Sequence, residues 1–320
     1  MTLLIQYTLI FASVLMLVAL GGCFAERSGV INIGLEGIMV IGALGGALVL
    51  KFMPVSVGAP VMVITTVIVS ALFGLVFSLL LAVAAINFKA DQTITGTAMN
   101  MLATAAATVA VKAMNTAASG GNDVSSDISY TRTKDLLLVH VGGFELNWFM
   151  LVAVLCLIAA YVALYKTRFG LRLRSCGENP QAADSLGINV YKMRYAGTTI
   201  SGALAGMGGF VYSLTTANCT ANGDVAGFGF LALAVMIFGN WKPLNIAGAS
   251  LLFGLFKCIA AAYSSIDLNG DGIYTLANLG ISSHLYRMLP YLVTLAVLAF
   301  TSKKSRAPKA EGIPYDKGSR

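Results

Sequence analysis

The chain has 320 residues, of which 57% are hydrophobic and only 11% are charged, whereas an average soluble protein has about 25% charged residues. This composition excludes an ordinary soluble domain and indicates a protein of the lipid bilayer. The net charge of +7 does not indicate nucleic-acid binding, because the basic residues gather in two short segments and form no polar domain.

Apolar runs along the chain predict an all-α membrane protein, a polytopic bundle of about 8–10 transmembrane helices. Several runs are near the ~20 residues that a helix needs to cross a bilayer. The run at 59–86 is long enough to tilt or break, and the run at 226–239 is short enough to be re-entrant. The nine runs are 3–22, 30–50, 59–86, 96–114, 147–165, 196–214, 226–239, 244–263 and 288–300.

Glycines interrupt the second run in the stretch SGVINIGLEG, residues 28–37, and predict one discontinuous helix near 30–37. Asn32 and Glu36 are four residues apart and share a helical face. A carboxylate in lipid faces a cavity or a partner, so the sequence predicts that Asn32 or Glu36 lines a water-filled path. Two alternatives stay open: Glu36 pairs with Arg27 or caps a half-helix, or the whole stretch lies at the cytoplasmic interface.

Polar residues also mark the start of the fourth run. Gln92 and Thr93 lie near its start and Asn100 lies deeper. The amide of Asn100 needs a hydrogen-bond partner, either in the bundle or on a solute. We assign these three residues to the same path, with interhelical hydrogen bonding of Asn100 as the alternative. Lys257 lies late in its run and is expected to snorkel to the outer interface.

The basic residues predict which parts of the chain face the cytoplasm. Residues 166–194 and 301–320 each hold six Lys or Arg against two acidic residues, and such loops remain inside. The sequence therefore predicts a multi-pass protein of the cell membrane, with a transmembrane domain at 1–301, a cytoplasmic loop at 166–195 and a basic cytoplasmic tail at 302–320. Two stretches with acidic residues and few basic ones are expected outside, 115–146 and 264–284.

The cytoplasmic loop contains its own helix signals. Asn179 can cap a helix, Pro180 suits the first helical position, and Gly187 supplies a left-handed stop. They predict a helix at 180–186, which is too short to be stable alone in water. Its small, mixed surface suits a groove on a partner; the alternative is an ordinary amphipathic loop.

Five segments together resemble one family. In this order they are ERSGVINIGLEGIMVIGA at 26–43, ADQTITGTAMN at 90–100, GENPQAADSLGINVYKMRYAG at 177–197, GFGFLALAVMIFGNWKP at 227–243 and GIPYDKGSR at 312–320. They are similar to the permeases of nucleoside ABC importers, within the larger group that serves ribose, other simple sugars and branched-chain amino acids. The resemblance implies that the short helix is a coupling helix. The docking residues for an ATPase are then Glu178, Asn179, Pro180, Gln181, Ala182, Ala183, Asp184, Ser185, Leu186 and Gly187.

The resemblance also implies partners. The sequence contains no GK dipeptide and hence no phosphate-binding GxxxxGK[ST] loop, so ATP hydrolysis is expected on a separate cytoplasmic ATPase. A second, different permease chain and an extracytoplasmic solute-binding protein are also implied. The expected solute is a nucleoside or a related sugar-bearing molecule, with a simple sugar or a branched-chain amino acid as the alternative. An ion-driven secondary transporter is less favoured, because few charged residues lie in the runs.

The sequence predicts no catalytic residues, no cofactor and no metal site. One stretch resembles part of a calcium loop. DLNGDGIYTLAN, residues 267–278, has Asp267, Asn269, Asp271 and Gly272 at positions 1, 3, 5 and 6 of the loop, but Asn278 where a bidentate Glu is required. We interpret it as a turn-rich external loop.

Overall fold

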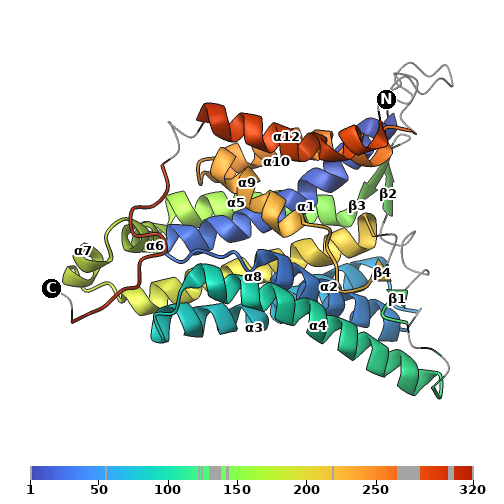
Figure 1. The fold of residues 1–320 in the computed structure, drawn as a ribbon, viewed down its shortest axis with the longest axis horizontal. Coiled ribbons are helices and arrows are strands. Elements are labelled where there is room, and N and C mark those ends of the chain that lie inside the picture. Colours follow the sequence, from blue (N-terminus) through green and yellow to red (C-terminus); the bar gives the residue numbers. More distant parts are fainter. Residues whose placement is uncertain are drawn as a thin grey trace.

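The computed structural model is a bundle of helices that lie side by side along one long axis (Figure 1). The structure describes residues 2–54, 56–121, 123, 125–129, 138–141, 144–217, 220–264, 282–301 and 306–318. The calcium-like stretch 267–278 lies outside the described residues.

Each of the nine predicted apolar runs contains a helix in the described part of the chain. The helices are α1 (Thr2–Arg27), α2 (Leu35–Phe52), α3 (Ala59–Ala82) with the π-helix η1 (Val83–Asn87), α4 (Gln92–Ala118), α5 (Trp148–Lys166), α6 (Arg168–Glu178), α7 (Pro180–Ser185), α8 (Val190–Thr215), α9 (Phe228–Phe238), α10 (Pro243–Ala262) and α12 (Ser283–Thr301). Two short antiparallel strand pairs join loops: β1 (Ile128–Ser129) with β4 (Thr220–Ala221), and β2 (Leu138–Val141) with β3 (Phe144–Asn147). The predicted all-α, polytopic fold is confirmed.

Six helices of the described residues are long and apolar enough to cross a membrane: α1, α2, α3 with η1, α4, α5 and α10. The 26-residue α8 is also long enough, since 26 residues span ~39 Å. Its lower hydropathy reflects the many glycine, serine and threonine residues through which it packs. The long run at 59–86 is not broken; it ends in the π-helical turn η1.

The centre of the bundle is built on close backbone contacts. A Cβ atom on Gly206 of α8 would meet the Ser70 carbonyl oxygen, and its next neighbour would be the Cα atom of Gly74 in α3, at 2.9 Å. A Cβ on Gly42 of α2 would in turn overlap the backbone of Gly206. Helices in lipid associate by such van der Waals contact between small residues, so α2, α3 and α8 form a tightly packed core.

Two elements reach only part of the way through the bundle. After α1 the chain runs without regular structure from Ser28 to Gly34 before α2 begins. The helix α9 has 11 residues and is ~16 Å long, about half of the ~30 Å hydrocarbon core. The predicted break near 30–37 is therefore present, as a non-helical segment between two helices.

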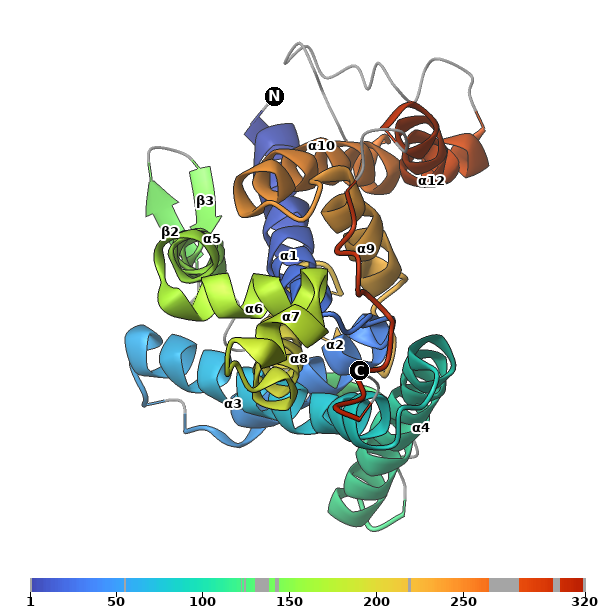
Figure 2. The same ribbon diagram turned by 90° about the vertical axis from the view of Figure 1, so that its left-hand side faces the viewer.

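The two ends of the bundle differ in what they carry. The helices α6 and α7 and the C-terminal residues lie at one end, while the N-terminus and strands β1–β4 lie at the other (Figure 1). Seen from the α7 end, α4 and α12 lie at separate corners of the bundle, with α2 and α9 between them (Figure 2).

Candidate functional site

Side chains of α4 hold the segment 28–34 and the start of α2. The Gln92 side-chain oxygen accepts a hydrogen bond from the Ile31 N–H at 2.7 Å. Asn100 accepts from the Gly37 N–H at 2.8 Å and donates to the Ile33 carbonyl at 3.1 Å. Irregular backbone at membrane depth is tolerated only where its polar groups are satisfied inside protein or along water. Gln92 and Asn100 therefore fix the shape of this segment.

The structure brings most of the predicted path residues together around the segment 28–34, where they hydrogen-bond other parts of the chain; their role in a path stays a prediction. Asn32 is fully buried and donates to the Ser201 hydroxyl of α8 at 2.9 Å. Gln92 is buried, Asn100 is half-buried, and only Thr93 is exposed. For Asn100, these contacts match the alternative of interhelical hydrogen bonding.

Glu36 caps the half-helix α9. Its two carboxylate oxygens accept hydrogen bonds from the N–H groups of Gly227, at 2.7 Å, and Gly229, at 2.6 Å. Glu36 also lies in the first turn of its own helix α2. A negative charge is favourable near a helix N-terminus, and here one carboxylate serves two of them. Of the alternatives open for Glu36, the half-helix cap is the contact that the structure contains.

The other end of α9 is fastened to α1. The Trp241 indole N–H donates to the Glu26 carboxylate at 2.5 Å, and the Trp241 carbonyl accepts from the Arg27 guanidinium at 3.1 and 3.2 Å. The chain from Glu26 to Glu36 and the chain from Gly227 to Trp241 are therefore joined at both ends. Together they form one closed unit, which we call the α9 clasp (residues 26–36 and 227–241).

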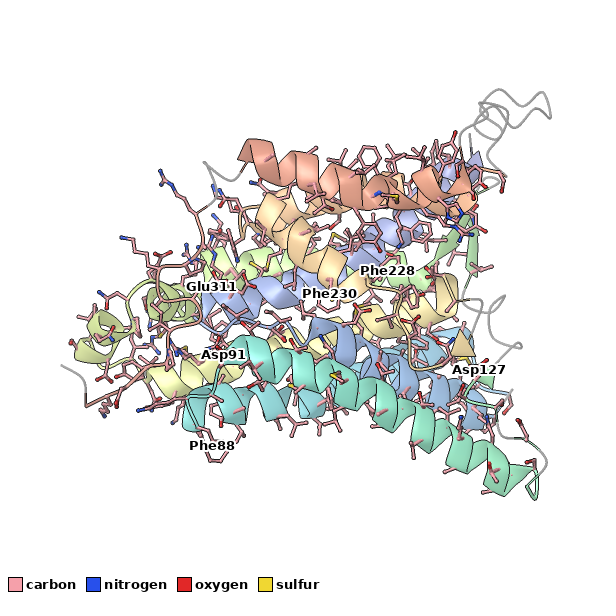
Figure 3. All side chains as sticks on the ribbon, viewed as in Figure 1. Phe88, Asp91, Asp127, Phe228, Phe230 and Glu311 are labelled. Atoms are coloured by element: carbon pink, nitrogen blue, oxygen red, sulfur yellow. The ribbon has the colours of Figure 1, made fainter. Side chains whose placement is uncertain are left out.

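Two aromatic side chains, Phe228 and Phe230, lie at the start of α9 (Figure 3). Phe228 is buried, with its ring centroid 4.9 Å from that of Tyr212, and the Lys257 Nζ lies 4.6 Å from the Phe228 centroid. The half-buried Lys257 packs its cation on this aromatic face, and its snorkelling to the outer interface stays a prediction. Phe230 is 51% exposed, so of these rings it is the one that can meet a solute directly.

The predicted short helix is present as α7. The Asn179 side chain accepts from the Ala182 N–H at 3.0 Å, and Gly187 has a positive φ of 79°. Pro180 begins the helix, as predicted. The sequence therefore placed both the cap and the stop of this helix correctly.

The faces of α7 differ from what the sequence suggested for Ala183. Pro180 and Ala183 are buried against the chain itself, Ala183 at 2% exposure. A substitution such as Ala183→Arg would disrupt the packing of α7 on its own chain and would not report on docking alone. The outward surface is formed by Gln181, Ala182, Ser185 and Leu186, and Leu186 is 82% exposed.

Sequence reasoning missed the partners of the site residues. The N–H groups of Gly227 and Gly229 are backbone atoms, which a search for polar side chains does not reveal. The signal that could have found them is the pair of glycines in GFGF at 227–230, directly before a short apolar run.

A membrane bundle with a clasped half-helix at mid-length and a capped short helix at one end has the architecture of a transport permease. Residues 4–298 match the family described as "Branched-chain amino acid transport system / permease component", and the chain belongs to this family. No solved structure matches it.

Relatives of full length carry more specific names. The chain is 39% identical to the guanosine ABC transporter permease protein NupQ of Bacillus subtilis, over 100% of this chain and 98% of NupQ. It is 38% identical to the nucleoside ABC transporter permease protein NupC of Lactococcus lactis, over 97% of this chain and 95% of NupC. The nucleoside ABC transporter permease protein NupB of the same organism is 24% identical, over 93% of this chain and 80% of NupB.

Proposed function

We propose that the chain is a permease subunit of an ABC importer for nucleosides, forming half of the path and leaving ATP hydrolysis to a separate ATPase. The observation that carries this proposal is the full-length similarity to permeases named for guanosine and nucleosides. The family as a whole is named for branched-chain amino acids, so a solute of that kind, or a simple sugar, is the alternative to be tested.

The end of the bundle that carries α7 faces the cytoplasm in this proposal. Residues 166–194 and 301–320 concentrate the basic residues there, and basic loops remain on the cytoplasmic side. Leu186, the most outward apolar side chain of α7, then fills an apolar pocket of the ATPase, flanked by Gln181, Ala182 and Ser185. An apolar side chain at 82% exposure gains from such burial, by about 1.5–3 kcal/mol for a leucine.

The path runs along the α9 clasp and the exposed side of α4. Support comes from the non-helical segment 28–34, since such backbone at membrane depth borders protein or water, and from the exposure of Thr93 and Phe230. An aromatic ring offers a stacking face for a nucleobase.

A second permease chain closes this path, and an extracytoplasmic binding protein delivers the solute. Lactococcus lactis has two relatives of this chain, NupB and NupC, both named as nucleoside permeases and differing in their similarity to it. This favours a partner permease that is a different chain.

The test is co-expression with the neighbouring ATPase and permease genes, purification of the complex and reconstitution into vesicles. We expect nucleosides, and neither ribose nor leucine, to stimulate ATP hydrolysis and to be taken up only when ATP is present on the α7 side. Stimulation by leucine or ribose alone would support the alternative solutes. Uptake driven by an ion gradient without ATP would contradict the ABC importer.

A further inference from the structure

The C-terminal residues 306–318 do not project from the bundle as a free tail. They lie along its α7 end, where Figure 3 places Glu311. Pro308, Ala310 and Tyr315 are buried. The backbone joins the rest of the chain at Ala310, whose N–H donates to the Gly177 carbonyl of α6 at 2.8 Å. We call this segment the strap.

One side of the strap supports α7. Tyr315 is 4% exposed and packs with Cys176, Ala183 and Val190 in a small apolar cluster separate from the main core. Its ring meets that of Tyr191 edge-on, with centroids 5.4 Å apart. The buried face of α7 therefore rests partly on the strap.

The other side of the strap touches the α9 clasp. The Gly312 N–H donates to the Gly29 carbonyl at 3.2 Å, and a Cβ on Gly312 would lie 2.7 Å from the Ile31 side chain. The Glu311 carboxyl lies close to the Glu26 carboxyl at the end of α1. The strap thus reaches both the last turn of α1 and the start of the segment 28–34.

The distance between these two attachments leaves little slack. Gly312 and Tyr315 are three residues apart, and three residues span at most ~11 Å. While Tyr315 stays in its cluster, α7 can move only until the chain between Gly312 and Tyr315 is fully extended. A larger movement of α7 displaces Gly29 and Glu26.

We propose that the strap transmits movement between α7 and the α9 clasp during transport, with Gly312 and Tyr315 as its positioning residues. This role rests on the proposed docking of an ATPase at α7. The strap makes no contact with the solute in this role. It determines how much of the movement of α7 on the ATPase reaches the α9 clasp.

The main test uses the complete complex with variants of the strap. Gly312→Ala is strained, because Gly312 has a positive φ of 74° and alanine disfavours that region. Gly318→Ala is the matched control, since it is the same substitution in the same segment, without a positive φ and with only Asp316 nearby, at 3.7 Å. Tyr315→Ala removes the anchor on α7, and a stop codon in place of Arg306 removes the whole strap.

We measure three quantities for each variant: ATPase recovered with the complex, solute uptake per ATP hydrolysed, and labelling of Cys176 by a membrane-impermeant maleimide. Cys176 is fully buried, and burial raises the pKa of its thiol, so it reacts slowly while the strap is in place. A Cys176→Ser chain gives the background labelling of the other cysteines.

We expect Tyr315→Ala and the truncation to keep the ATPase and the hydrolysis of ATP. Uptake per ATP should fall between about twofold and thirtyfold, the range by which residues between two sites alter their coupling. Uptake per ATP in Gly312→Ala should lie between that of the wild type and that of the truncated chain. Uptake per ATP in Gly318→Ala should match that of the wild type. Cys176 labelling should rise in Tyr315→Ala and in the truncated chain, which shows that the strap has left α7.

Unchanged uptake per ATP in the truncated complex would overturn the proposal, because the movement would then pass through α8 and its Ser201–Asn32 contact. Loss of the ATPase from the truncated complex would also overturn it, making the strap a docking contact. If the truncated chain fails to insert, the comparison of Gly312→Ala with Gly318→Ala decides. The proposed docking of an ATPase at α7 is tested separately with Leu186→Ala. If this variant keeps the ATPase fully bound, the docking proposal fails, whatever the strap variants show.

Discussion

Replacing Glu36 with glutamine tests whether this residue holds the half-helix α9. Its two carboxylate oxygens accept from the N–H groups of Gly227 and Gly229. Glutamine has the same shape but one acceptor, and its NH₂ group would face an N–H. One buried donor without a partner costs about 1–3 kcal/mol. Removing the charge from a helix N-terminus costs about 0.3–1 kcal/mol more, and up to about 2 kcal/mol when partly buried.

The combined loss of about 1.3–5 kcal/mol raises the local opening of α9 by a factor of roughly 10 to 5,000. Hydrogen exchange of the 227–238 amides, followed by mass spectrometry on the assembled complex, measures this factor directly. We expect faster exchange in Glu36→Gln, an intact complex and reduced uptake. Asp91→Asn is the control: it makes the same change of carboxylate to amide at the exposed cap of α4, where asparagine caps as well as aspartate.

Unchanged exchange at α9 in Glu36→Gln would refute this reasoning about the cap. If uptake were then lost as well, Glu36 would act on the solute directly. If uptake and exchange both stayed at the wild-type level, Glu36 would have no role in transport.

Three further predictions concern docking, packing and pH. Leu186→Ala should weaken ATPase binding by about 1.5–3 kcal/mol, seen as a higher dissociation constant in a pull-down titration. Gly206→Ala should lower the melting temperature of the purified permease, since overpacking costs about 1–3 kcal/mol, whereas Gly248→Ala, which meets nothing within 4 Å, should not. Burial raises the pKa of Glu311, against smaller opposing effects of Glu26 and Arg27, so the docked strap holds the Glu311 proton more tightly. Binding of the strap to the bundle should weaken as pH rises from the pKa of a free glutamate, ~4.3, through the raised pKa of Glu311. The anisotropy of a fluorophore attached at Gly318→Cys should then fall.

The pH response depends on every charged group around Glu311. Glu26 and Arg27 both lie close enough to lower the pKa of Glu311, and the Trp241 N–H holds the Glu26 carboxyl in place. Glu311→Gln keeps the size and polarity of the side chain without a titrating proton. Its anisotropy should therefore change less with pH than that of the parent chain; an equal change would assign the effect to another group.

The helices could be predicted because their signals are local. Each of the nine apolar runs correctly predicted a helix. Asn179, Pro180 and Gly187 predicted the short helix α7 with its cap and its stop. The break at 28–34 was also visible, because glycines and Asn32 interrupt an apolar run. Each of these inferences uses residues within one or two helical turns of one another.

The contacts of the site could not be predicted, because their partners are far away in the sequence. The donors to Glu36 lie 191 and 193 residues downstream and are backbone groups. The side of α7 that is buried depends on Tyr315, more than a hundred residues further along, so a six-residue helix of mixed composition gave no reason to place Ala183 inward. The strap itself looked like a basic tail, since the main-chain N–H groups of Ala310 and Gly312 that anchor it leave no trace in a pattern of side chains.

The geometry of the α9 clasp explains why a strap at one end can act at mid-depth. Glu36 joins α2 to the start of α9, while Trp241 joins the end of α9 to Glu26 and Arg27. Turning α9 alone would break the hydrogen bonds at both of its ends, so the helix and the segment 28–34 move together. The strap is attached at the α1 end of this unit, through Gly29 and Glu26. A pull there is therefore carried along a stiff helix to Glu36, about half a bilayer away, without any deformation of the tightly packed core of α2, α3 and α8.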